Sequence, residues 1–567
     1  SVLVIALYLP FWNNKNIHDD AIQCVTEVID YCLTALLDPQ RARIVVCGDF
    51  NDLRLYSDEI SRVTNLTQIV NFPTRVNNTL DLIFTNFSQS HPPSCLAPIG
   101  KSDHVCVFWC PSRNCSKVVK QRVRKFSKSS IISFHNFVDN VDWLSYVHDI
   151  SNLDFAFSTL LCTLRYIFDM FFPLKTVRMR PDDKPWVRPS LKLLINARDR
   201  AFFKQQSSKY RRLRREVIAH IKDLKEQYFA QIARTKDPRK MWKSVRSFSG
   251  QASFSSPLPS PEQFSDYFSS VFQHEQPVNE FPDILGSNVS DVFSVSEVFS
   301  LLSSLKRKSC GPDGLPYWVF RNSASSFSPV LTFLFNRSVC EAYVPLCLKK
   351  AYVTPVPKVP RAANVSDFRP ISLLPIVSKV FEKLVSKHFI LPCIRDRLTS
   401  QFAYIPGPGS GTCCSLTYIY DRMLKFLDTS GAVRVLSIDF SKAFDKILHS
   451  SIVTSAQKFC LPPNIINWIK SFLSNRFQCV RVKGVFSSWS LIRSGVPQGS
   501  VLGPILFCMV VDSLSSVSPN SLCVKYADDI TILHFVRCVS DDHLQSELDN
   551  VCDWSRVNKL CLNESKS

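Results

Sequence analysis

The sequence predicts a multidomain protein of α/β and α+β architecture, with a strand-rich region over residues 1–110, a basic helical region over 111–290 and a mixed region of helices and strands over 291–567. Length supports this division, because 567 residues are too many for one domain. A hydrophobic content of 45% supports packed cores and excludes a disordered chain. A formal net charge of +20 indicates a polyanionic partner such as nucleic acid.

Cysteine usage and the apolar runs indicate the compartment. The 21 cysteines are typical of a reducing, intracellular environment, and Cys106, Cys110 and Cys115 near His104 fit no common zinc spacing. The apolar run 1–7 has no initiator Met and no basic segment, so we expect a strand cut from a longer protein. No apolar run reaches about 18 residues, so no membrane span is expected.

In the first region, three stretches place acid, amide or imidazole side chains beside predicted strands. They contain Asp49 with Asn51, then Asp81, and then Asp103 with His104. We expect Asp103 to orient the imidazole of His104, and the imidazole to contact a phosphate. Asp, Asn and Ser are also ordinary turn residues, so each stretch taken alone is more simply a turn.

The second region is basic and predicted to be helical, above all over residues 198–246. The apolar residues at helical spacing there are Leu213, Val217, Ile221 and Leu224. Either this helix packs on a neighbouring domain with a solvated basic face, or its surface follows a nucleic-acid backbone. The interleaved aromatic residues Tyr210, Tyr228, Phe229 and Trp242 favour the second interpretation. Residues 117–128 read as a charged linker, and 251–262 as a flexible connector.

The third region contains two motifs suited to binding a nucleoside triphosphate. Residues 352–369 are predicted to form a hairpin that brings Lys358 and Arg369 over the phosphates, where cations stabilise charge during transfer. Either cation alone would be an ordinary surface residue. Residues 495–504 predict a glycine-bearing turn that opens an apolar helix, where Gly499 permits close approach to a base pair and Gln498 contacts the incoming nucleotide.

Acidic residues end two apolar strands in the third region. The run 522–535 predicts a strand, a two-residue turn and a second strand, with Asp528 and Asp529 at the tip. Two carboxylates there are costly without a cation, and Mg²⁺ is the obvious candidate, with Mn²⁺ as an alternative. An ordinary Asp-rich turn would explain this pair alone. Asp439 ends the strand 433–440, and three carboxylates can hold two metal ions about 4 Å apart for nucleotidyl transfer.

Several motifs together resemble known families. FRPISLLP (368–375), DFSKAFD (439–445), GVPQGSVLGPILF (495–507) and YADD (526–529) are similar to the reverse transcriptases of non-LTR, LINE-type retrotransposons. FPTR (72–75) and TLDLIF (79–84) resemble the jockey-like branch of these elements. Residues 1–110 resemble the C-terminal half of the exonuclease–endonuclease–phosphatase sandwich, in its apurinic-endonuclease-like form.

The polymerase resemblance implies a right-hand fold, with fingers before Asp439 and palm from there on, and without a complete thumb. It implies that Asp439 and Asp528 are the main metal ligands with Asp529 beside them, and that Lys566 protonates the pyrophosphate. The implied nucleotide-binding residues are Lys358, Arg369, Phe440, Phe444, Gln498 and Gly499, with Phe444 excluding the 2′-hydroxyl. Implied partners are an RNA template, a DNA primer at a nicked target, dNTPs and the element's own RNA as a ribonucleoprotein, in the nucleus and cytoplasm.

The nuclease resemblance implies phosphodiester cleavage, with a site formed by Tyr8, Asp49, Asn51, Asp81, Asp103 and His104. In that family the metal-binding Glu and a substrate-orienting Asn lie on strands before the start of this chain, so we expect no nicking activity. The stretch 401–411 lacks an arginine that many relatives carry. A catalytically decayed or domesticated nucleic-acid-binding remnant is the alternative, and the nuclease half disfavours an intron-encoded or telomerase-type enzyme.

Overall fold

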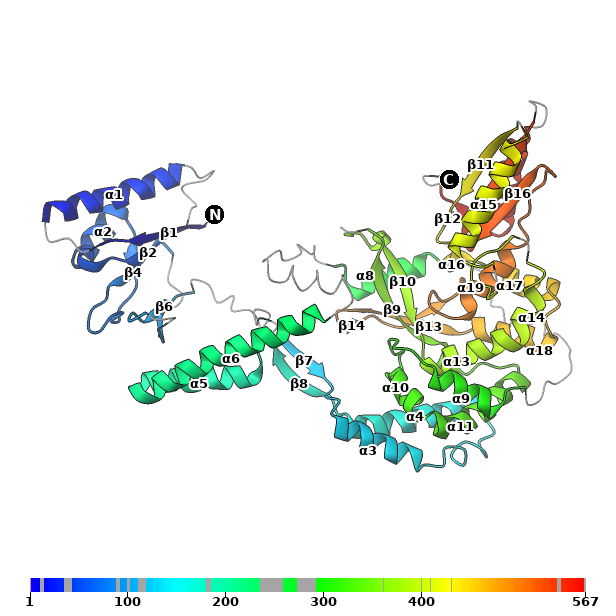
Figure 1. Cartoon of the computed structure of the whole chain (residues 1–567), viewed down its shortest axis with the longest axis horizontal. Helices are drawn as coiled ribbons and strands as arrows, with labels where there is room; N and C mark the ends of the chain where they lie inside the picture. Colours follow the sequence, from blue (N-terminus) through cyan, green and yellow to red (C-terminus); the bar gives the residue numbers. More distant parts are fainter. Residues whose placement is uncertain are drawn as a thin grey trace. The chain divides into compact units, whose positions relative to one another are not determined.

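The computed structural model forms two compact units, each described here by itself (Figure 1). The first consists of Ser1–Val123 with Thr176–Ser253, and the second of Arg124–Lys175 with Phe254–Ser567. The described residues are 2–10, 15–34, 43–87, 92–98, 102–110, 119–179, 184, 186–234, 258–272, 292–359, 362–398, 400–407, 409–429, 431–537 and 542–564. Within these ranges, no helix combines the length and the apolar character needed to cross a membrane.

The first unit contains a four-stranded sheet in the order β1-β2-β4-β3. Its strands are β1 (Val2–Tyr8), β2 (Arg43–Asp49), β3 (Thr67–Gln68) and β4 (Asp81–Thr85). β1 and β2 are parallel because α1 (Lys15–Thr34) crosses over between them, whereas β4 pairs antiparallel with β2. Val46 and Phe84 pack under α1 and α2 (Ser57–Thr64), and Ile83 packs on the opposite face of the sheet near β5 (Ser94–Leu96) and β6 (Cys106–Phe108). The carboxyl end of β2 and the start of β4 therefore meet at one edge.

The basic region forms an antiparallel hairpin of two helices, α5 (Pro189–Phe203) and α6 (Ser207–Ala233), which lie side by side in Figure 1. Leu213, Val217 and Leu224 are buried, so the predicted helical spacing is confirmed. The Tyr210 ring lies 5.3 Å from that of Phe202, and Tyr228 and Phe229 contact Trp186. Tyr210 therefore contacts the other helix of the hairpin, whereas Tyr228 and the exposed Phe229 contact Trp186, which precedes α5. Trp242 lies outside the described residues.

The prediction of a linker is wrong at two places. Val119–Val123 is strand β7, which pairs with β8 (Lys175–Met179) in a two-stranded sheet. Residues 124–175 belong to the second unit, where α3 (Lys128–Asp139) and α4 (Leu153–Phe171) bury Phe134, Phe157 and Phe168 in its main core. Apolar spacing on these two helices, rather than basic charge, determines where they pack.

Helices form most of the core of the second unit. The further helices before the strand that ends at Asp439 are α8 (Pro261–Ser270), α9 (Val295–Ser303), α10 (Tyr317–Asn322), α11 (Ala324–Cys340), α12 (Leu346–Lys349), α13 (Ile376–Val385), α14 (Leu391–Ile394) and α15 (Thr412–Leu427). After it come α16 (Ala443–Lys446), α17 (His449–Lys458), α18 (Pro463–Leu473), α19 (Leu502–Val511) and α20 (Leu544–Val557). In this core, Phe335 of α11 stacks on Phe381 of α13, and Trp468 of α18 meets Phe381 edge to face.

Two sheets frame the cleft described below. One has the order β10-β9-β13, extended by β14 and β15, and the other has the order β11-β17-β16. Their strands are β9 (Lys350–Pro357), β10 (Phe368–Leu373), β13 (Arg476–Val482), β14 (Val485–Phe486), β15 (Ser490–Ile492), β11 (Ala432–Ile438), β16 (Ser521–Tyr526) and β17 (Asp529–Val536); a short pair joins β12 (Phe440–Ser441) to β18 (Cys561–Leu562).

The predicted division into fingers before Asp439 and palm after it does not hold for residues 476–492. β13 pairs parallel with β9, in register from Phe477 opposite Lys350, so the chain returns to the earlier sheet after passing Asp439. This return was not visible in the sequence because a parallel pairing has no local turn that would announce it. The sheet that carries the β9–β10 hairpin is therefore built from both halves of the unit.

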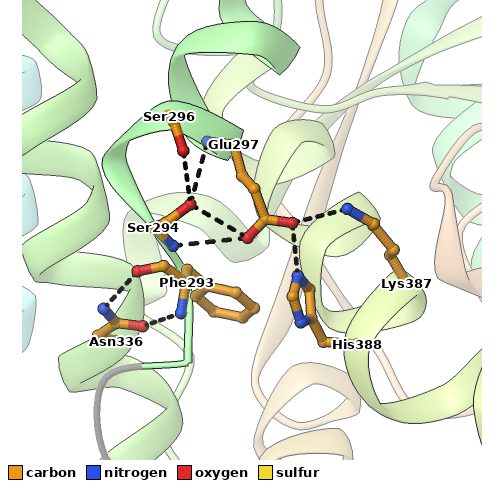
Figure 2. A network of polar contacts seen from close by, with 7 residues as sticks. All are labelled: Phe293, Ser294, Ser296, Glu297, Asn336, Lys387 and His388. Carbon is orange, nitrogen blue, oxygen red and sulfur yellow. Dashed lines mark hydrogen bonds and ion pairs between the residues drawn. The ribbon is translucent and has the colours of Figure 1, made fainter.

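A polar network ties α9 to the π-helical segment Ser386–Ile390 (Figure 2). Glu297 completes a capping box with Ser294 at the start of α9. Its other oxygen accepts hydrogen bonds from Lys387 at 2.6 Å and from His388 at 3.0 Å. These contacts, led by the hydrogen bond from Lys387, lower the pKa of Glu297 to about 2.

We expect Glu297→Gln to destabilise the protein at neutral pH by on the order of 2 kcal/mol. Because the folded-state pKa lies below the ordinary value of 4.5, the charge stabilises the fold above about pH 4.5, and this contribution is lost as the pH falls toward 2. Thermal unfolding of both proteins between pH 3 and 7 measures it, since Gln still completes the capping box. The control is Glu341→Gln, which breaks an exposed ion pair with Arg337 and should shift the midpoint little. An equal difference at every pH would contradict the assignment.

Candidate active site

The acidic hairpin forms as predicted. β16 and β17 pair antiparallel with Tyr526 opposite Asp529, which leaves Ala527 and Asp528 as a two-residue turn. Ala527 has a φ of 57°, the left-handed conformation that such a turn requires at its first position. The turn thus presents one carboxylate directly and the second from the first residue of β17.

The third carboxylate lies in register with this turn. β11 pairs antiparallel with β17, and Ile438 stands opposite Ile530, so Asp439 follows at the level of Asp529. Asn563 holds Asp439 in place: its side-chain amide donates to Asp439 Oδ2 at 2.7 Å, and its backbone N–H donates to the Asp439 carbonyl at 2.8 Å. The predicted convergence of two strand ends is confirmed, and Asn563 is a positioning contact that sequence reasoning missed.

Electrostatics at this edge favour a bound cation. Burial raises the pKa of Asp528, and the charges of Asp529 and Asp439 raise it further, whereas Arg369 lowers it. Carboxylate oxygens are the donors that Mg²⁺ prefers, and one or two of them suffice when phosphate oxygens supply the rest. The residues present therefore fit a divalent ion. Among the described residues, no three His, Cys, Asp or Glu side chains are close enough to hold a metal by themselves.

The carboxylates line a cleft of about 640 Å³. Other parts of its lining come from the β10-β9-β13 sheet and from the turn before α19. The β9–β10 hairpin, which forms as predicted, brings Lys358 and Arg369 into the lining. Lys358 Nζ donates to the Ser366 carbonyl at 3.0 Å, which keeps its ammonium over the hairpin end. Arg369 is solvent-exposed. The lining of one cleft therefore combines these cations with the carboxylates.

The turn before α19 lies against β10. The Ser372 N–H donates to the Gln498 carbonyl at 2.7 Å, and a Cβ on Gly499 would stand 2.5 Å from the Ser372 carbonyl oxygen. Gly499 has a φ of 128°, which only glycine adopts readily. Close approach of another backbone thus explains the glycine at position 499. The sequence predicted a base pair as the neighbour, whereas the neighbour in this structure is strand β10.

Gln498 is held by an acid that the sequence analysis did not single out. Its side-chain amide donates to Asp445 Oδ1 at 2.8 Å, and both residues line the cleft. Burial raises the pKa of Asp445 to about 6, while Gln498, Lys442 and Lys358 act in the opposite direction. This contact uses an N–H of the Gln498 amide, so the amide oxygen of Gln498 stays available as an acceptor.

The two predicted nucleotide-binding phenylalanines differ in their positions. Phe440 is only 3% exposed and its ring lies 5.7 Å from that of Trp554, so its side chain is part of the core although the residue borders the cleft. Phe444 lines the cleft with its ring 4.5 Å from Phe507. Lys566, predicted to protonate the pyrophosphate, lies outside the described residues.

Helix α8 contributes a wall that the sequence analysis placed in the linker region. Phe264 and Phe268 pack with Val353 under the β9–β10 hairpin, beside which α8 lies in Figure 1. Tyr267 borders the cleft, and Lys442 Nζ lies 4.2 Å from the centre of its ring. The signal was present in the sequence: Ser260 and Gln263 form a capping box with a proline in the first turn.

The first unit has its own cleft of about 580 Å³, lined by Asp49, Asp81, Ser102, Asp103 and His104 among others. His104 Nδ1 lies 2.8 Å from Asp81 Oδ2, whereas Asp103 forms an ion pair with Arg75 at 2.9 Å. The prediction that Asp103 orients the imidazole is therefore wrong, because pairing in the sheet and the loop before β6 bring Asp81 closer.

The other two residues predicted for that site do not border the cleft. Asn51 is 2% exposed, and its side-chain amide donates to the Leu9 carbonyl at 2.7 Å, so it closes the loop after β2. Tyr8 is 74% exposed at the end of β1. Asp49 and Asp81 stand directly opposite each other in the β2–β4 pairing, which is the feature that brings the acids together.

The part of the second unit that carries the cleft is similar to a known family. Residues 356–567 match the family described as reverse transcriptase (RNA-dependent DNA polymerase). A probable RNA-directed DNA polymerase from transposon X-element of Drosophila melanogaster is 29% identical over 244 residues, covering 42% of this chain and 27% of the relative. The RNA-directed DNA polymerase from mobile element jockey of Drosophila funebris is 28% identical over 288 residues, covering 49% and 31%. The matches thus span less than a third of either relative.

Among solved structures, apo telomerase from Candida tropicalis is similar over 39% of this chain and 44% of that chain, with 14% identity and a TM-score of 0.29. A likeness this low adds nothing to the assignment, which depends on the family match and on the residues that line the cleft.

Proposed function

Because residues 356–567 carry a reverse transcriptase domain similar to those of jockey-like non-LTR retrotransposons, we propose that this chain is an RNA-directed DNA polymerase. The observation that carries the proposal is the single cleft in which Asp439, Asp528 and Asp529 face Lys358 and Arg369. Nucleotidyl transfer needs this arrangement, because carboxylates hold divalent ions and cations neutralise the triphosphate.

The three carboxylates are the residues that would hold two Mg²⁺ ions. Held there, divalent ions would supply Lewis-acid activation of the primer 3′-hydroxyl and charge stabilisation of the leaving pyrophosphate. Asn563 keeps the Asp439 carboxylate oriented, and the hairpin turn keeps Asp528 at the end of β16. Arg369, which already lowers the pKa of Asp528, would lie close enough to bind phosphate oxygens next to the metal site.

The base and sugar of the incoming nucleotide would lie against the turn before α19. Gln498, oriented by Asp445, offers its amide oxygen, and Phe444 supplies an aromatic surface held by Phe507. An aromatic side chain under the sugar leaves no room for a 2′-hydroxyl, which favours dNTPs over NTPs. Lys566 remains part of this proposal as the proton donor to pyrophosphate.

The substrates and the reaction context follow by similarity to the retrotransposon relatives. The template would be RNA, the primer a DNA 3′-hydroxyl at a nicked target, and the element's RNA a stable partner. The basic α5–α6 hairpin of the first unit, with exposed Arg211, Arg212 and Arg215, suits a nucleic-acid backbone. The Asp81–His104 pair of the first unit suits a phosphodiester contact.

Primer extension on poly(rA)/oligo(dT) with Mg²⁺ and labelled dTTP tests the proposal. We expect template-dependent synthesis that EDTA abolishes and excess Mg²⁺ restores. Replacing Arg369 by alanine should raise the KM for dTTP about tenfold with a smaller effect on kcat, since a phosphate contact is lost. Its control is Arg422→Ala, which alters an arginine on α15 that packs over Tyr418. Duplex binding without any extension would replace the polymerase assignment by that of a nucleic-acid-binding remnant.

A further inference from the structure

We propose that Gln401 is a positioning residue that fixes the acidic turn of the polymerase cleft. Gln401 opens the stretch 401–411, and it is not a member of the cleft lining. Its side chain nevertheless contacts the backbone of Ala527, the residue immediately before Asp528. The inference rests on the proposed function, because it concerns how the metal-binding carboxylates are held.

The stretch around Gln401 adds to the edge of β16. The Lys525 N–H donates to the Ser400 carbonyl at 2.9 Å, and the Phe402 N–H donates to the Lys525 carbonyl at 3.0 Å. Gln401 and Lys525 thereby form a parallel bridge. This pairing brings the Gln401 side chain to the end of the strand, next to the turn.

The Gln401 side chain supplies a hydrogen-bond acceptor to a backbone N–H of the turn. In a two-residue hairpin, the first turn residue has no ladder partner for its N–H. Gln401 Oε1 accepts from the Ala527 N–H at 3.1 Å and from the Ala403 N–H at 3.0 Å. Ala527 is 3% exposed and has a φ of 57°, so its N–H is inaccessible to water and its conformation is one that alanine disfavours. Without the acceptor, the left-handed turn would lose the contact that offsets its strain.

The amide has one orientation that fits. Two backbone N–H groups require the oxygen, which leaves Gln401 Nε2 buried without a hydrogen-bond partner. A buried unpaired donor is costly. The side chain is nevertheless held in this orientation by the hydrogen bonds that its oxygen accepts from Ala527 and Ala403. A glutamate would keep the acceptor and remove the unpaired donor.

The strand below the turn is anchored separately. Lys525 is 1% exposed, and its Nζ donates to the Asp512 carbonyl at 3.0 Å, at the end of α19. Lys525 therefore fixes the end of β16 from the helix side, and Gln401 fixes the tip from the edge. Loss of Gln401 should move the Asp528 carboxylate while the strand stays paired.

The test compares Gln401→Met with Gln401→Glu in the full chain. Methionine fills a similar volume without an acceptor, so we expect kcat for extension to fall about tenfold and the Mg²⁺ concentration for half-maximal rate to rise several-fold, with KM for dTTP nearly unchanged. Glutamate supplies the acceptor, so its Mg²⁺ requirement should stay at or below that of the wild type. Mn²⁺ binding, followed by EPR without nucleotide, should weaken in the methionine variant and not in the glutamate variant.

Each outcome either supports or overturns the role proposed for Gln401. Wild-type kcat and Mn²⁺ affinity in Gln401→Met would overturn the proposal, as would an equal loss of Mn²⁺ binding in both variants. If Gln401→Met does not fold, retention of Mn²⁺ affinity by Gln401→Glu supports the acceptor role and its loss refutes it. If the wild type binds Mn²⁺ but does not extend primers, the polymerase assignment fails while the Mn²⁺ comparison still tests Gln401.

Discussion

Replacing Asp528 and Asp529 together by alanine should reduce primer extension by at least about 10³-fold, equivalent to about 4 kcal/mol of transition-state stabilisation. The turn itself should survive, because Ala527 keeps its contact to Gln401 and β16 keeps its pairing with β17. Removing the two charges relieves both the burial of the Asp528 carboxylate, which is the main cause of its raised pKa, and its repulsion by Asp529, so the thermal midpoint should not fall. Steady-state extension and thermal unfolding of the same preparations measure both effects.

The matched control is Asp421→Ala, which removes an exposed carboxylate paired with Lys425 on α15. It changes the net charge without touching the cleft, so its extension rate should equal that of the wild type. Extension by the double alanine variant at more than a tenth of the wild-type rate would show that these carboxylates are not the metal ligands.

Replacing Gly499 by alanine should reduce extension about 100-fold, with a loss of stability of roughly 2–3 kcal/mol. The new Cβ would stand 2.5 Å from the Ser372 carbonyl oxygen, and the φ of 128° is unfavourable for alanine. The turn would move away from β10, and with it Gln498, whose carbonyl accepts from the Ser372 N–H at 2.7 Å. Because the nucleotide is held by this turn, we expect KM for dTTP to rise and kcat to fall.

Gly484→Ala separates the two causes. Gly484, between β13 and β14, has a φ of 87° and no atom within 4 Å of an added Cβ. This variant keeps the conformational cost and lacks the collision, so it should lose about 1 kcal/mol of stability and no activity. Similar activity losses in both variants would mean that the approach to Ser372 does not control the site.

The elements that carry the chemistry were predictable because their signals are local. Runs of apolar and β-branched residues mark β11, β16 and β17, and the adjacent acids Asp528 and Asp529 mark the hairpin tip, whose turn the structure places at Ala527 and Asp528. The β9–β10 hairpin, with Lys358 and Arg369 at its end, has the same kind of signal. Motifs read in this way predicted a reverse transcriptase, and residues 356–567 match that family.

Predictions failed where sequence proximity was taken for spatial proximity. Asp103 precedes His104 in the chain, but the β2–β4 pairing and the loop before β6 place Asp81 at the imidazole instead. Helix α8 was assigned to a linker because its neighbours are rich in serine and proline, whereas Phe264 and Phe268 pack on strands that come much later. Backbone pairing and apolar burial determine these long-range contacts, and the residues adjacent in the sequence do not reveal which partner is chosen.

The sequence by itself determined which residues can do the chemistry: acids at strand ends, a hairpin with cations, and a glycine turn before an apolar helix, each specified by neighbours within a few residues. Only the tertiary structure decided how these residues are held. Gln401 reaches Ala527 across 126 positions, and Gln498 reaches Asp445 across 53. Hydrogen bonds of this range exist only after the sheets and the core have formed, because packing brings the partners together and excludes the water that would otherwise compete for them.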